Sequence, residues 1–312
     1  MAFLSNVLTA FTQVLILFLV AAVGFACQKT GIYTEKASRL STDLLFYIVA
    51  PAVIVRSFCA MEFNISALKG LGLAFLGGVI LHLVGLAFSA LLFNNGDEDS
   101  CIYKYACAYG NVGYMALPLA QAVLGDEGVF YCSVIIVPFN ILSFTHGVHI
   151  MSRKAGEKSF SVKKLIANPG VIGVALGLPL FLSGVKLPEV IYMPVSYLAD
   201  LNTPLAMIMF GTYLASADWK TIFSDKRVFV TAGVKIVLVP LITIGILKLL
   251  GFNSVLLAAC VLSAAAPTAN NTVMFAAKYG RNTAAASKAT ALISIMSVIT
   301  MPVMIALAQY LG

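Results

Sequence analysis

The chain has 312 residues and a net charge of +7, with 60% hydrophobic residues and only 11% charged ones. Soluble globular proteins carry about 25% charged and about 45–50% apolar residues, so this composition excludes a water-soluble fold. It also excludes disorder, which requires low hydrophobicity. Because the basic residues lie in short segments between apolar runs, the charge indicates membrane orientation rather than nucleic-acid binding. An integral membrane protein is the remaining class.

Ten apolar runs follow one another along the chain, each long enough for a membrane-spanning helix of about 20 residues. The alternating pattern of a membrane β-barrel is missing, so the sequence predicts an all-α membrane protein with ten transmembrane helices. The predicted spans are 7–27, 38–58, 67–93, 102–124, 128–150, 165–184, 189–215, 228–250, 254–277 and 284–311. These spans leave no room for a catalytic domain outside the membrane.

The lysines and arginines predict the orientation of the chain. With the N-terminus outside, fifteen of them fall in cytoplasmic segments and three in external ones. The excess of positive charge on the cytoplasmic side therefore predicts that both termini lie outside. The protein is expected to be a multi-pass protein of the plasma (inner) membrane.

A hydrophilic basic loop at 151–164 divides the chain into two five-helix repeats, 1–150 and 165–312. Because five is odd, the second repeat enters the membrane in the opposite sense to the first. Inverted repeats of this kind build many secondary transporters. Pro51 in the second span and Pro204 in the seventh occupy similar positions in the two halves.

Spans four and nine each carry a cluster of helix-breaking and polar residues near the middle. Gly110, Gly113 and Pro118 interrupt span four, and Pro267 interrupts span nine. Proline removes a backbone donor, and the polar groups that are freed must be satisfied by protein or by a water-filled cavity. Two breaks in matched spans of inverted halves predict a binding site near the membrane midplane. The alternative is that these prolines form structural kinks only.

A half-helix that begins near Pro118 or Pro267 would point its N–H groups and the positive end of its dipole at the membrane centre. Such an end favours a carboxylate, and neighbouring asparagine side chains can donate hydrogen bonds to it. The predicted substrate-binding residues are Asn111, Gly113, Tyr114, Pro118, Asn202, Pro267, Thr268, Asn270 and Asn271.

Four polar or ionisable residues inside or near the spans are candidates for coupling or gating, because intramembrane ionisable residues are usually functional. They are Asp43, Asp200, Lys235 and Gln121. A structural ion pair or an interfacial anchor is the alternative for each. No metal site is expected, because His146 and His149 have no further ligands nearby.

Four segments carry a family resemblance: GNVGYMALPL, NPGVIGVALGL, DLNTPLAMIMFG and APTANNTVMFAAKYG. Through them the chain resembles the auxin efflux carrier family over nearly its full length, in the short prokaryotic branch without a long cytoplasmic loop. The resemblance implies a ten-helix fold like that of bile-acid symporters and sodium–proton antiporters. Spans 1, 2, 6 and 7 would form a scaffold, and spans 3–5 and 8–10 a mobile transport domain. It further implies crossed breaks in spans four and nine, an elevator-type movement and a homodimer through the scaffold.

These observations predict a secondary transporter for a small organic anion bound where spans four and nine cross. No catalytic motif and no phosphate-binding loop is present, so neither an enzyme nor direct use of ATP is expected. No cofactor is expected beyond possible coupling to H+ or Na+, and the partners would be the anion and the lipid bilayer. The alternatives are a ligand-sensing membrane receptor that uses the same pocket, and a cation or proton exchanger.

Overall fold

The computed structural model describes residues 2–94, 97–152, 167–216, 222–223, 225–252 and 254–312. Within these residues the chain is helical and forms no strand, which confirms the all-α prediction. The predicted basic loop at 151–164 lies, beyond Ser152, outside the described residues. The helices are α1 (Ala2–Lys29), α2 (Glu35–Leu44), α3 (Ala50–Ala60), α4 (Ile65–Leu92), α5 (Ser100–Ala108), α6 (Leu117–Leu142), α7 (Val148–Ser152), α9 (Pro169–Ser183), α10 (Glu189–Asp200), α11 (Asn202–Ser216), α13 (Lys226–Gly233), α14 (Val239–Leu249), α15 (Ser254–Ala265), α16 (Asn271–Lys278) and α17 (Thr283–Leu311).

Five described helical stretches are long and apolar enough to cross a membrane, which supports a multi-pass membrane protein. They are Lys36–Ala60, Ile65–Leu92, Val112–Ser152, Lys226–Leu249 and Thr283–Leu311, and shorter apolar helices cover Leu15–Lys29, Pro169–Ser183 and Val255–Ala265. The ten spans, the inverted repeat and the orientation stay predictions.

The stretch Val112–Ser152 is a hairpin rather than one straight helix. Gly125 adopts a left-handed conformation inside it, with φ 67° and ψ −159°. A straight helix from residue 112 to residue 142 would be about 45 Å long. Yet the Tyr109 hydroxyl, three residues before the stretch, donates to the Leu142 carbonyl at 3.0 Å. The chain therefore turns back at Gly125, between predicted spans four and five.

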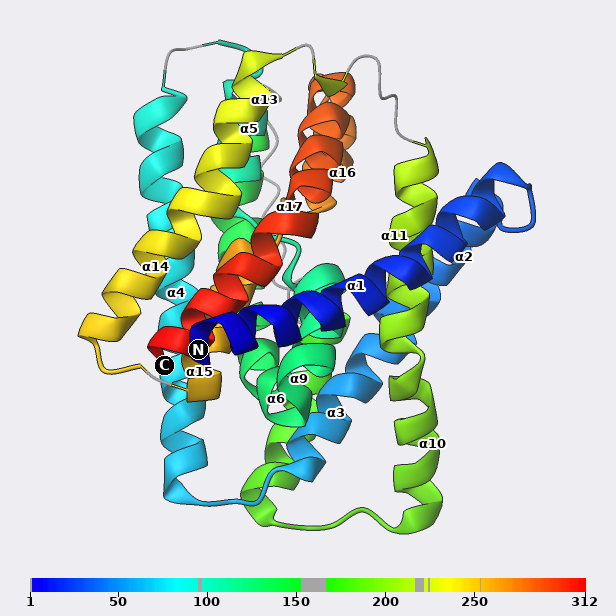
Figure 1. The fold of residues 1–312 in the computed structure, drawn as a ribbon, viewed down its shortest axis with the longest axis vertical. Helices are drawn as coiled ribbons and strands as arrows, with labels where there is room; N and C mark the ends of the chain where they lie inside the picture. The colour runs from blue at the N-terminus through cyan, green and yellow to red at the C-terminus, as the bar shows by residue number, and fades with distance from the viewer. Residues whose placement is uncertain (1, 95–96, 153–166, 217–221, 224, 253) are drawn as a thin grey trace.

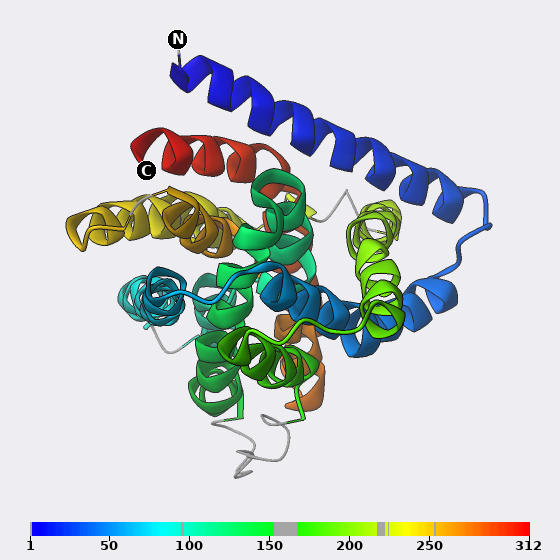
Figure 2. The ribbon, with the colours of Figure 1, turned by 90° about the horizontal axis from the view of Figure 1, so that it is seen from below.

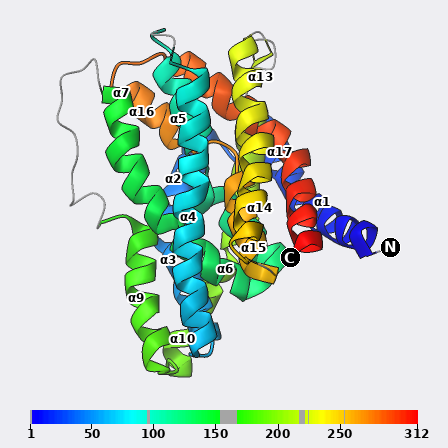
Figure 3. The same cartoon turned by 90° about the vertical axis from the view of Figure 1, so that its left-hand side faces the viewer.

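Four π-helical turns interrupt the long helices of the described chain: η1 (Leu45–Val49), η2 (Val112–Ala116), η3 (Ser143–Gly147) and η4 (Val234–Leu238). Such turns are frequent at functional sites. Figure 3 shows α4 running the height of the molecule, with α5, α7 and α16 towards one end and α9 and α10 towards the other.

Helix α1 crosses one face obliquely and packs on α11 and α17 (Figures 1 and 2). Its contact with α11 depends on glycine, because a Cβ on Gly211 would lie 1.8 Å from the Ala21 carbonyl oxygen. A Cβ on Gly24 would lie 2.1 Å from the Ile208 carbonyl oxygen. Small residues that let two backbones touch are typical of helix packing in membranes.

Candidate functional site

Two broken helices cross through backbone hydrogen bonds. The first break separates α5 from η2 at residues 109–111, and the second separates α15 from α16 at residues 266–270. The Asn111 N–H donates to the Pro267 carbonyl at 2.6 Å, and the Ala269 N–H donates to the Tyr109 carbonyl at 2.9 Å. Each break thereby satisfies backbone groups of the other, as a non-helical segment inside a membrane protein requires. We call this pairing of residues 109–111 with 267–269 the crossover.

The first break lies closer to Gly110 than to Pro118. The helix resumes at Val112, and Pro118 occupies the first turn of α6 directly after the π-helical turn η2. Because η2 continues directly into α6, Pro118 lies inside a helical stretch and does not begin it. Gly110 is where space is short, because a Cβ there would lie 3.2 Å from the Ala266 carbonyl oxygen. The close approach of the two broken segments, rather than the proline, sets the position of this break.

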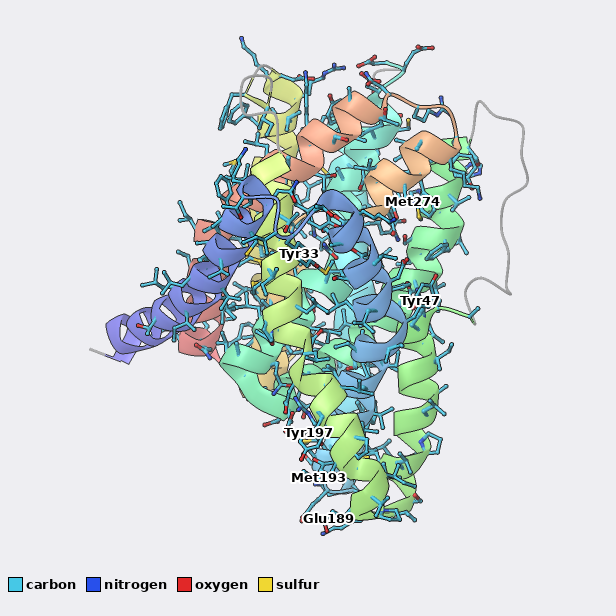
Figure 4. The ribbon with its side chains drawn as sticks, turned by 90° about the vertical axis from the view of Figure 1, so that its right-hand side faces the viewer. Tyr33, Tyr47, Glu189, Met193, Tyr197 and Met274 are labelled. Carbon is cyan, nitrogen blue, oxygen red and sulfur yellow. The ribbon has the colours of Figure 1, made fainter. Side chains whose placement is uncertain are left out.

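A cavity of about 970 Å³ lies on one side of the crossover, bordered by η1, η2, η3, α11, α16 and α17. Figure 4 shows the face on which Tyr47 of η1 and Met274 of α16, two lining residues, are found. Most of the wall is apolar and aromatic, and the rings of Phe46 and Tyr114 stack with centroids 5.5 Å apart. The polar lining residues are Thr42, Asp43, Tyr47, Asn111, Tyr114, Asn140, Asn168, Tyr213, Asn270, Asn271, Ser287, Thr290 and Ser294.

The structure brings part of the predicted site together in this cavity. Its lining includes Asn111, Gly113, Tyr114, Asn270 and Asn271. These residues lie at the N-terminal ends of η2 and α16, where the helix dipole favours negative charge. The Asn111 side chain accepts a hydrogen bond from the Tyr114 N–H at 3.3 Å and so caps η2. Asp43 also lines the cavity and is a carboxylate in an otherwise neutral set of described lining residues.

Other predicted site residues lie outside the cavity lining. Thr268 is fully buried, with its hydroxyl 3.5 Å from the Tyr109 carbonyl, and Pro267 contributes its carbonyl to the crossover. The Pro118 carbonyl accepts a hydrogen bond from Thr203. Asn202 is buried at the start of α11, and its amide has no hydrogen-bond partner in the described chain.

Asn140 and Asn168 are cavity residues outside the predicted set. The Asn168 amide donates to the Asn140 side-chain oxygen at 3.2 Å. The Asn140 side-chain nitrogen is buried without a partner among the described residues, which leaves a donor in the cavity wall. Buried polar groups are normally paired, so such a donor is suited to a ligand. In the sequence, Asn140 is marked as an isolated asparagine in an apolar run, and Asn168 as the first residue of the NPG motif that opens α9.

A charged cluster joins α3, α10 and the first part of α6. Arg56 donates to Asp200 at 2.6 Å and to Gln121 at 3.1 Å. Gln121 in turn donates to Asp126 at 3.2 Å. Two candidates for coupling, Asp200 and Gln121, therefore take part in one network around an arginine. Asp126 was missed because it sits in a polar turn that the sequence marks only as a connection.

Replacing Arg56 by methionine is expected to lower the apparent melting temperature in detergent by a few degrees. The Arg56 side chain is 11% exposed but that of Asp200 is 68% exposed, so solvent screening reduces the loss to about 1 kcal/mol. Arg56→Lys should recover part of the loss, because a lysine cannot reach Asp200 and Gln121 together with the same geometry. Equal melting temperatures for wild type and Arg56→Met would contradict a structural contribution from this cluster.

An apolar helical bundle with crossed helix breaks, beside a largely apolar cavity that carries several asparagines, is typical of a membrane transporter. The family model described as "Membrane transport protein" matches residues 9–305. The chain therefore belongs to this family of membrane transporters, which confirms the resemblance found in the sequence.

Curated relatives agree with this assignment. The chain is 25% identical to a "Putative malonate transporter" of Rhizobium meliloti (strain 1021) over 269 residues, which cover 84% of this chain and 81% of the relative. It is 26% identical to an uncharacterized transporter of Methanocaldococcus jannaschii over 249 residues, covering 74% and 79%. An uncharacterized transporter of Methanothermobacter thermautotrophicus is 22% identical over 306 residues, covering 93% and 95%.

Proposed function

We propose that the protein is a secondary transporter for a small organic anion, which binds in the cavity beside the crossover. The observation that carries the proposal is the direction of the broken helices. The N-terminal ends of η2 and α16 border the cavity with Asn111, Asn270 and Asn271. Helix N-termini with amide donors are suited to a carboxylate.

The size and polarity of the cavity indicate which kinds of anion it could hold. At about 970 Å³ it is at the upper end of the roughly 300–1,000 Å³ of small-molecule sites. A short dicarboxylate such as malonate, named for the Rhizobium relative, would fill a small part of it near the asparagines. The apolar remainder would accept a carboxylate with a hydrocarbon or aromatic body. The screen below therefore covers both kinds of anion.

In this proposal α1, α2, α3, α9, α10 and α11 form the scaffold, and the remaining helices form a transport domain that moves as an elevator. Exposed apolar side chains on α10, among them Val190 and Tyr197, give the scaffold a surface for lipid or for a second copy. Both termini would lie outside a plasma membrane, and the protein would be a homodimer. Asp43 is the candidate for ion coupling, because it is the carboxylate among the described residues that line the cavity.

The test is uptake by purified protein in liposomes, with labelled malonate, malate, succinate, benzoate and an indole carboxylate. Each anion is offered without a gradient, with a pH gradient and with a Na+ gradient. We expect saturable uptake of at least one anion, and Asp43→Asn should flatten any dependence on the pH gradient. Thermal stabilisation by an anion without uptake would favour a receptor, and flux of cations alone would favour an exchanger. Full activity of an Asn111→Ala and Pro118→Ala double variant would contradict the proposed site.

A further inference from the structure

Lys235 is buried against the crossover on η4. Its side chain is fully buried, and its ammonium donates to the Ala264 carbonyl at 2.9 Å. A Cβ on Gly110 would lie 3.0 Å from the Lys235 Nζ, so the ammonium touches the backbone next to Asn111. Ala264 lies in the last turn of α15, whose free carbonyls carry partial negative charge. The lysine thus interacts with the C-terminal end of one half-helix.

The two sides of the crossover have opposite electrostatic character. On the cavity side, the N-terminal ends of η2 and α16 offer donors to an anion. On the other side, the C-terminal end of α15 holds the ammonium of Lys235. Within the part of the chain that the structure describes, the ion pairs are those of Arg56 and Arg227, and none includes Lys235. Among the described residues, no carboxylate pairs with it, and backbone dipoles balance its positive charge.

An unbalanced charge inside a membrane protein is costly and is normally paired. A carboxylate at Asn111 would be the nearest full negative charge, one residue away from the glycine that Lys235 contacts. The low polarity of the surroundings weakens screening, so the two charges would stabilise each other across the crossover. The cost of burying the lysine would then fall when the anion binds.

We propose that Lys235 is the fixed countercharge of the crossover, so that a bound monovalent anion and the lysine cross the membrane together as a nearly neutral unit. The inference rests on the proposed function and adds an electrical property to it. In a carrier of this kind, the loaded protein moves no net charge at this site. The positive charge of the empty carrier moves on the return step instead.

The experiment separates the loaded step from the empty step. Exchange of labelled for unlabelled anion, with saturating anion on both sides of the liposome, uses the loaded step alone. The probe is the monocarboxylate of the screen that wild type binds most tightly. A membrane potential of about 100 mV is set with a K+ gradient and valinomycin. Wild-type exchange should be insensitive to it, because one positive and one negative charge move together.

Lys235→Met should make exchange change several-fold with the potential, because the loaded carrier now moves one negative charge. The same variant should bind the anion roughly tenfold more weakly by thermal shift, through loss of the charge attraction. Lys235→Arg keeps the charge and should restore both properties. Lys248→Met removes one positive charge from the far end of the same span, on α14, and should leave both unchanged.

The outcomes distinguish the two proposals. If wild type carries an anion but Lys235→Met keeps the same affinity and the same insensitivity to potential, the countercharge is overturned and the transport function stands. Wild-type exchange that itself depends on the potential overturns it as well. If wild type binds and carries no anion of the screen, the proposed function fails first. Should Lys235→Met not fold, Lys235→Gln, which keeps a donor without the charge, is measured in the same way.

Discussion

Replacing Asn111 by aspartate is expected to weaken carboxylate binding at least a hundredfold without lowering the stability of the protein. Asparagine and aspartate are equally good N-caps, so the hydrogen bond from the Tyr114 N–H should be kept. The variant nevertheless places a negative charge of the same shape where the carboxylate would bind. Two like charges about 4 Å apart repel by about 4 kcal/mol at an effective dielectric constant of 20.

Two further variants separate the contribution of Asn111 to anion binding from its contribution as an N-cap. Asn111→Ser keeps an N-cap but removes the amide, and should weaken binding about tenfold through loss of one charge-assisted hydrogen bond. Asn282→Ala is the matched control, because Asn282 caps α17 through the Ala285 N–H and is not among the cavity-lining residues. It should lower stability without changing affinity. Dissociation constants from thermal shift or calorimetry give the comparison, and unchanged affinity in Asn111→Asp would refute the assigned site.

Gly211→Ala should be among the most destabilising single changes in the protein. The added Cβ would lie 1.8 Å from the Ala21 carbonyl oxygen, and the obstacle is backbone of α1 rather than a flexible side chain. The two helices would have to move apart along their whole contact. Overpacking of this kind costs about 3 kcal/mol. We expect a large fall in the apparent melting temperature and in the yield of folded protein.

Gly245→Ala is the matched control for this prediction. Gly245 lies inside α14, and a Cβ there would meet no atom within 4 Å. Alanine has a better helix propensity than glycine, so this variant should be as stable as wild type or slightly more so. Size-exclusion chromatography after heating in detergent compares the two variants. If Gly211→Ala were as stable as Gly245→Ala, the close packing of α1 on α11 would be wrong.

Apolar run length and helix-breaking residues made much of the architecture predictable. Runs of about 20 apolar residues predict helices because a membrane satisfies no backbone group. The gap between spans four and five was predicted at 125–127, and the structure turns back at Gly125. Pro267 correctly marked the second break, because a proline without an N–H cannot continue the ladder.

The position of the first break depends on a tertiary contact rather than on the local sequence. Pro118 looked like the break, yet the helix resumes at Val112 and the proline follows a π-helical turn. What selects residues 109–111 is the other chain segment, which crosses there and pairs with the backbone. A contact between segments about 158 residues apart, Gly110 with Thr268, leaves no local signal in the sequence.

Contacts between segments that are remote in the chain also give the ionisable residues different roles. Asp43, Asp200 and Lys235 looked alike as polar positions in apolar runs. In the structure Asp43 lines the cavity, Asp200 pairs with Arg56, and Lys235 holds the end of α15. The partners come from other helices in each of the last two cases.

The excess of hydrophobic residues by itself determined that this protein lies in a membrane and consists of helices, because those properties depend on the composition and period of each segment. The order of the polar clusters also indicated which two helices are broken. Only the tertiary structure decided where they cross, which asparagines share the cavity and which charges are paired. Those features depend on distances between segments that are remote in the chain, and packing alone sets such distances.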